Sequence, residues 1–112
     1  MPSPRLTRLE VRYAALRQEL AGIGYLSHGS VYRRPAGQSG TRFTWSTKVQ
    51  AKTVSLALSA EQADWLEKAI AEHRRVKTIL AEMRRLSRQI MRASFADTER
   101  RRPLNQKVLR LI

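Results

Sequence analysis

The residues of this chain that are best suited to chemistry are cations and aromatic rings in its first half. Between Glu19 and Glu61 the sequence contains no aspartate or glutamate. The basic residues of this segment are Arg33, Arg34, Arg42, Lys48 and Lys52, and the aromatic residues among them are Tyr25, Tyr32, Phe43 and Trp45. Cationic side chains attract phosphate irrespective of base sequence, and interleaved rings either stack on bases or form the core beneath them. The segment therefore predicts a nucleic-acid contact made by these five cations, with Tyr32 as its exposed ring.

A second group of cations lies near the end of the sequence. Three consecutive arginines, Arg100, Arg101 and Arg102, come directly before Pro103. This run is either a solvated linker or an additional arm that contacts phosphate. The apolar residues that follow it, from Leu104 to Ile112, either cover a helix of the same chain or bind a partner protein.

The composition of the whole chain agrees with an acidic partner. Its 112 residues include 22 Lys and Arg but only 9 Asp and Glu, which gives a formal charge of +13. Such a charge favours nucleic acid, with a basic protein-interaction module or a membrane surface as the alternatives. The sequence has no run near the roughly 18 apolar residues of a membrane span, so we expect a cytoplasmic protein without a membrane partner.

The reactive residue types speak against catalysis. There is no cysteine and there are only two histidines, His28 and His73, which argues against disulfides and against a metal site. An enzyme needs a nucleophile, a base or a metal held together in a pocket. The sequence offers no such set, so we expect a non-catalytic protein with no cofactor.

The elements that must position these residues form an α+β fold. Spacing, caps and alternation predict a helix over 4–21, strands over about 30–34, 41–49 and 52–58, a long helix over 60–93, and a basic and apolar tail over 94–112. Residues 1–93 are expected to make a single domain with a three-stranded antiparallel sheet. Alternation places Arg42, Thr44, Ser46 and Lys48 on one face of this sheet. The other face, with Phe43, Trp45, Val54 and Leu56, is expected to pack on the long helix, and Trp65 is expected in the same core.

The long helix carries a coiled-coil-like seam. Its seam residues follow a strict spacing of three and four: Leu66, Ala69, His73, Val76, Leu80, Met83, Ser87 and Ile90. With about twice the length of the first helix, it has more seam than an intramolecular pair can cover. The surplus predicts a homo-oligomer through Leu80, Met83 and Ile90, with the tail as the competing cover.

Three motifs resemble those of a family of short bacterial proteins of unknown function. They are Gly29-Ser-Val-Tyr-Arg-Arg34, Phe43-Thr-Trp-Ser-Thr-Lys48, and Lys52-Thr-Val-Ser-Leu-Ala-Leu-Ser-Ala-Glu-Gln62 before a long helix. The resemblance covers roughly residues 20–90 and implies a link to mobile elements. Relatives often carry closely spaced cysteines in the loop before the second strand, which suggests a small metal knuckle. Residues 35–40 here contain none, so the resemblance brings no metal site to this chain.

Taken together, the sequence predicts a DNA-binding, or RNA-binding, accessory or regulatory protein of a bacterial or phage mobile element. The order of strands and helix also resembles the arm-binding domains of tyrosine integrases, which present a sheet to the major groove. The alternative is a protein-interaction adaptor or inhibitor that docks on a larger recombinase, transposase or effector complex. Direct binding to nucleic acid would depend on the cationic side chains, whereas the binding of an adaptor to its partner would depend on the seam residues of the long helix.

Overall fold

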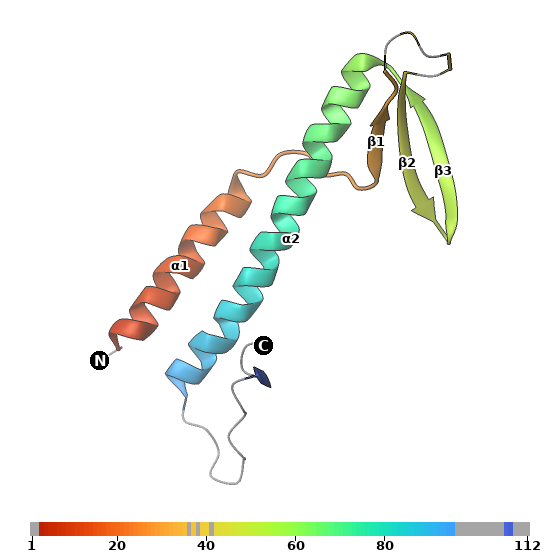
Figure 1. The fold of residues 1–112 in the computed structure, drawn as a ribbon. Helices are drawn as coiled ribbons and strands as arrows, with labels where there is room; N and C mark the ends of the chain where they lie inside the picture. The colour runs from red at the N-terminus through yellow and green to blue at the C-terminus, as the bar shows by residue number, and fades with distance from the viewer. Residues whose placement is uncertain (1–2, 36, 38, 41, 96–106, 109–112) are drawn as a thin grey trace. The chain divides into compact units, whose positions relative to one another are not determined.

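The fold consists of a helix, a three-stranded sheet and a second, longer helix (Figure 1). The computed structural model describes residues 3–35, 37, 39–40, 42–95 and 107–108. Helix α1 spans Pro4–Ala21, strands β1, β2 and β3 span Ser30–Arg33, Phe43–Val49 and Lys52–Leu58, and helix α2 spans Ala60–Ser94. These elements confirm the predicted α+β class, with every boundary within two residues of its predicted position.

Both helices begin at caps that the sequence encodes locally. The hydroxyl of Ser3 accepts a hydrogen bond from the amide of Leu6 at 3.1 Å, and Pro4 is the first helical residue of α1. Ahead of α2, the Gln62 amide donates to Ser59 Oγ at 3.1 Å and the Ser59 amide donates to Gln62 Oε1 at 2.9 Å. Each cap satisfies amides that the helix itself leaves unpaired, which stabilises the helix by about 1 kcal/mol.

The turn between β2 and β3 is formed by residues that are poorly suited to it. Gln50 has φ 49° and Ala51 has φ 66°, so both lie in the left-handed region. Positive φ at both central residues is the conformation of a type I′ hairpin turn, which matches the twist of the strands and favours Asn-Gly. A tight hairpin therefore joins β2 to β3 at these two residues, and its left-handed backbone is strained because neither residue is glycine or asparagine.

This turn gives a first testable prediction. Gln50→Asn combined with Ala51→Gly should raise the free energy of unfolding by about 1 kcal/mol, because left-handed backbone costs other L-residues about 1–2 kcal/mol and glycine very little. The midpoint of urea denaturation measures the effect. Ala51→Val is the control, since a β-branched residue at positive φ should lower the midpoint. A midpoint that moves the same way in both variants would contradict the assigned turn.

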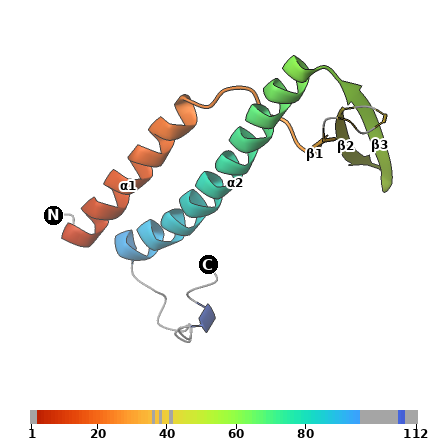
Figure 2. The same ribbon diagram turned by 45° about the horizontal axis from the view of Figure 1, so that its top comes forward.

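The three strands form one antiparallel sheet in the order β1-β2-β3 (Figure 2). Val31 lies opposite Trp45, and Trp45 lies opposite Leu56. Because directly paired residues share a face, these three side chains lie on the apolar side of the sheet. The prediction that this whole side packs on the long helix is wrong for β3, where Val54 and Leu56 are exposed, Leu56 by 55%.

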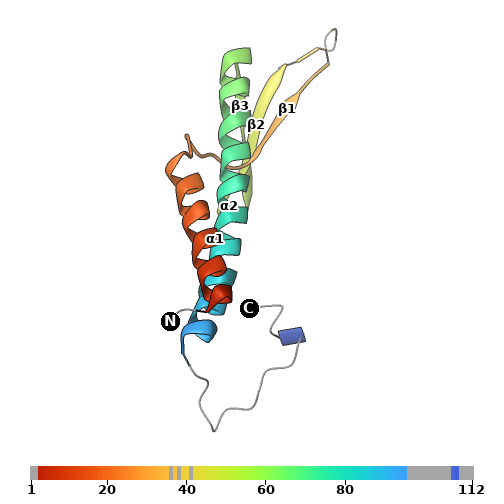
Figure 3. The same ribbon diagram turned by 90° about the vertical axis from the view of Figure 1, so that its left-hand side faces the viewer.

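The described chain divides into two compact units. One contains α1 and the second half of α2, from Lys77, and the other contains residues 23–76, with the sheet and the first half of α2. In the first unit the two helical segments run antiparallel, side by side (Figures 1 and 3). Arg12 donates to both carboxylate oxygens of Glu82, at 2.9 and 3.1 Å, and this holds the pKa of the Glu82 carboxyl below its usual value.

The buried residues of the first unit, called the helical unit below, differ from the predicted seam. Leu16, Ile79 and Leu86 are buried, and Leu9, Tyr13, Leu20 and Met83 pack against them. Ile79 and Leu86 lie outside the predicted row, whereas Leu80, inside it, is exposed. Met83, predicted to contact a second subunit, packs within the chain against the core that α1 shares. Ile90 is half-buried.

Candidate nucleic-acid interface

The pairing of the strands defines a polar sheet face. Tyr32 lies opposite Thr44, and Lys48 lies opposite Thr53. By the same alternation the face comprises Ser30, Tyr32, Thr44, Ser46, Lys48, Thr53, Ser55 and Ala57. It carries an ammonium, a phenol and five aliphatic hydroxyls, and none of its members is acidic. Hydroxyl and ammonium donors beside one ring can bind a phosphate backbone.

Two predicted cations continue this face at the ends of their strands. The Arg34 amide donates to the Arg42 carbonyl at 2.6 Å, so the β1–β2 ladder extends one residue beyond the strands. Arg42 also holds its guanidinium 5.4 Å from the centroid of the Phe43 ring. Tyr32, one of the predicted contacts, is 57% exposed. The structure therefore places Tyr32 on β1 and Lys48 on β2, with Arg34 and Arg42 directly beyond the ends of these strands, all within a single unit.

Arg33 alternates to the opposite side of β1 from Tyr32, although its guanidinium and that of Arg42 both contact the Phe43 ring. Its guanidinium donates to Glu67 Oε1 and to Asp64 Oδ1, each at 2.6 Å, and lies 5.1 Å from the centroid of the Phe43 ring. The two hydrogen bonds raise the pKa of Arg33 above its usual value, that to Glu67 contributing most. The carboxylates that neutralise Arg33 come from α2 and not from the acid-free segment itself. Arg33 ties β1 to α2.

Lys52 also stands apart from the polar sheet face. It pairs with Val49 across the hairpin, which places it on the side of Trp45 and Leu56. Among the predicted cations of the first half, Arg33 and Lys52 thus fall on the apolar side. The predicted arm Arg100, Arg101 and Arg102 lies outside the described residues, and so do residues 36, 38 and 41 between β1 and β2.

The two tryptophans differ in burial, although both were predicted to lie in the core. Trp45 is half-buried and its indole N–H donates to the His28 carbonyl at 2.8 Å, in line with a core position. Trp65 is 51% exposed, so its predicted core placement is wrong. Its ring instead lies beside that of Tyr25, with centroids 5.4 Å apart and planes inclined by 36°.

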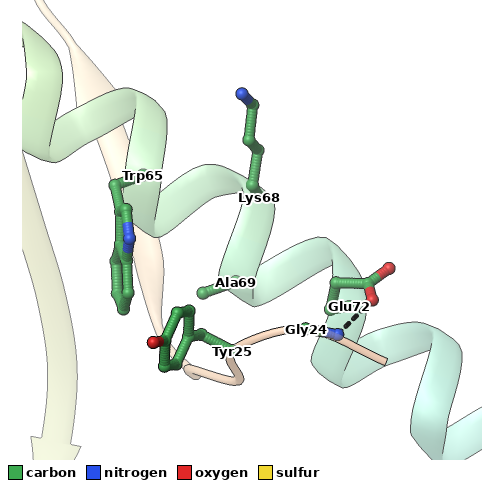
Figure 4. A pocket seen from close by; sticks show the side chains of 6 residues that line it. All are labelled: Gly24, Tyr25, Trp65, Lys68, Ala69 and Glu72. Carbon is green, nitrogen blue, oxygen red and sulfur yellow. Dashed lines mark hydrogen bonds between the residues drawn. The ribbon is translucent and has the colours of Figure 1, made fainter. Parts of the chain in front are cut away.

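A small cavity accompanies this aromatic pair (Figure 4). It has a volume of about 180 Å³ and is lined by Gly24, Tyr25, Trp65, Lys68, Ala69 and Glu72. The 23–28 segment that carries Tyr25 is fixed to α2 by two backbone donors: the Gly24 amide donates to Glu72 Oε2 at 3.0 Å and the Ser27 amide donates to the Ala69 carbonyl at 3.1 Å. Tyr25 was one of the rings noted in the acid-free segment, but its partner is 40 residues away in sequence.

Neither metal nor membrane features are found in the part of the chain that the structure describes. Its histidines, aspartates and glutamates form no group of three or more that could hold a metal ion. None of its helices combines the length and the apolar character needed to cross a membrane.

Comparisons of the chain with protein-family models, with curated proteins and with solved structures found no match. The function is therefore inferred from the site itself.

Proposed function

We propose that the protein binds nucleic acid, with DNA as the first expected partner, as a non-catalytic accessory or regulatory factor of a mobile element. The observation that carries the proposal is the polar sheet face, where Lys48, Tyr32 and five hydroxyls are gathered without a carboxylate. Arg34 and Arg42 continue it, and the net charge of +13 supplies long-range attraction to phosphate.

In this proposal the cations and the hydroxyls have different tasks. Lys48, with the flanking arginines, neutralises phosphates and so supplies most of the affinity and its dependence on salt. The hydroxyls of Thr44, Ser46, Thr53 and Ser55 donate to phosphate oxygens and fix the position of the backbone. The face of a small, twisted β-sheet is one of the surfaces that proteins place in the major groove.

The test compares two lysine substitutions in the same hairpin. Lys48→Gln should lower the salt dependence of duplex-DNA binding, with the slope of log K against log salt falling by about one, because one phosphate contact is lost. Lys52→Gln removes the same charge from the apolar side and should leave the slope within error. Fluorescence anisotropy with a mixed-sequence duplex, over a range of salt, measures both, and the mass of the protein is determined in the same buffers.

Two results would count against the proposal. Loss of all binding at about 0.15 M salt would remove nucleic acid as the partner. Equal slopes for the two variants would remove the polar sheet face as the contact, since diffuse attraction to a cationic chain does not distinguish the two lysines.

The exposed apolar side of β3 favours a second candidate, the adaptor. Val54 and Leu56 are exposed on β3, the last strand in the sheet order, and Val49 is exposed at the end of β2. The outer edge of β3 carries no further strand among the described residues. A partner protein can add a strand to such an edge and cover its apolar row. An adaptor of this kind should show only weak, non-specific DNA contact in the anisotropy experiment. Its binding to a partner should be lost when Val54 is changed to lysine.

A further inference from the structure

We infer that the Tyr25–Trp65 pair is a stacking site for one unpaired base of single-stranded nucleic acid. The inference rests on the proposed function and deepens it, because it adds a contact that selects unpaired bases. The two rings touch each other and are nevertheless 75% and 51% exposed. Aromatic side chains bury large apolar areas when they can, so an exposed pair beside a cavity marks a surface that a ligand can cover.

The size of the cavity limits the ligand to a single flat group. Its volume of about 180 Å³ is below the roughly 300–1,000 Å³ of pockets for drug-sized molecules. One side is formed by the Trp65 and Tyr25 rings and the floor by the small side chain of Ala69 (Figure 4). Every base has a π-face, so stacking on such a surface tolerates any sequence but requires that the base leave its pair.

The charges around the cavity are compatible with a phosphate backbone. The nearby carboxylates are already paired: Asp64 and Glu67 with Arg33, and Glu72 with Arg75 at 3.5 Å and with the Gly24 amide. Lys68, on the rim, has no ion pair among the described residues. Its ammonium extends away from the rings (Figure 4). A cation at the rim, outside the stacking surface, is suited to the phosphate of the stacked nucleotide.

The backbone segments that carry the two rings are held in place before any ligand binds. Tyr25 lies between Gly24 and Ser27, the two residues whose amides donate to α2, and Trp65 lies on α2 itself. All of these residues belong to the unit formed by residues 23–76. A site whose rings are preorganised loses little conformational entropy on binding, which favours affinity.

The experiment uses the full chain with oligothymidylate and oligouridylate of about 15 nucleotides, close to the site sizes of single-strand binders. Stacking should quench the Trp65 fluorescence, and the quenching should disappear in Trp65→Phe because only Trp45 remains. Trp65→Phe should nevertheless retain most of the affinity, since it keeps a ring. Trp65→Leu and Tyr25→Leu should each weaken single-strand binding on the order of 10-fold. Binding to a blunt duplex should change less than twofold.

Phe95→Leu is the matched control, because it removes a ring that is 72% exposed and belongs neither to the cavity nor to the polar sheet face. It should leave the quenching intact. Unchanged single-strand affinity in Tyr25→Leu and Trp65→Leu, with duplex binding retained, would overturn the stacking site and leave the proposed function standing. Absence of binding to every nucleic acid at about 0.15 M salt would overturn both. The thymidylate and uridylate arms separate a DNA ligand from an RNA ligand.

Discussion

Gly29→Ala should lower the free energy of unfolding by about 2–5 kcal/mol, although the substitution adds only one methyl group. Gly29 has φ 91°, and a Cβ at this position would lie 2.5 Å from the Ser46 carbonyl oxygen and 2.9 Å from Trp45 Nε1. Left-handed backbone costs alanine about 1–2 kcal/mol. The overlap adds about 1–3 kcal/mol, because the obstructing oxygen belongs to the backbone of β2 and cannot rotate away.

Two other glycines of the chain provide matched controls. Gly37 has φ 90° with nothing within 4 Å of its Cβ position, so Gly37→Ala isolates the cost of the backbone angle. Gly24 has open space and no left-handed angle, so Gly24→Ala should be close to neutral. Denaturation by urea, followed by tryptophan fluorescence, should order the variants Gly24→Ala, Gly37→Ala and Gly29→Ala by increasing loss. A Gly29→Ala variant no worse than Gly37→Ala would contradict the close approach of Gly29 to β2.

The parts of the fold that sequence predicts are those encoded over a few residues. The caps at Ser3 and at Ser59 with Gln62 act across three residues, and their hydrogen bonds form in the structure. The alternation of β2 and β3 likewise predicts both strands and their hairpin. In each case the interaction partners are close in sequence, so their spacing is sufficient to identify them.

The parts that sequence analysis missed depend on contacts between distant residues. Arg33 was predicted to be free for phosphate, but it is paired with acids 31 and 34 residues away. Trp65 was assigned to the core from its helix position, yet the first half of α2 buries Ala63, Ala69 and Ile70 instead. A strict heptad row assumes one continuous partner along a helix, whereas α2 belongs to two units, and its buried positions differ from that row.

Leu16→Ala should lower the free energy of unfolding by about 3 kcal/mol, through the helical unit. Leu16 is 1% exposed and lies at the centre of the core with Ile79 and Leu86. Truncation to alanine loses the transfer free energy of three carbon atoms and leaves a cavity. Together these two effects lower the free energy of unfolding by about 2–5 kcal/mol for a buried leucine. A protein of this size has only about 5–15 kcal/mol in total, so the helical signal in circular dichroism should melt at a clearly lower urea concentration.

Val11→Ala is the control within the same helix. Val11 is 65% exposed, so its truncation leaves no cavity, and alanine is the better helix former.

The pair of variants also tests whether α1 or a second subunit covers the face of α2 around Met83. If α1 covers that face within the chain, Leu16→Ala should destabilise the protein equally at all protein concentrations. If a second subunit covers it instead, Leu16→Ala should resemble Val11→Ala, and the melting midpoint should rise with protein concentration, because dimers are stabilised by mass action. The packing of Met83 against the Leu16 core supports the first outcome.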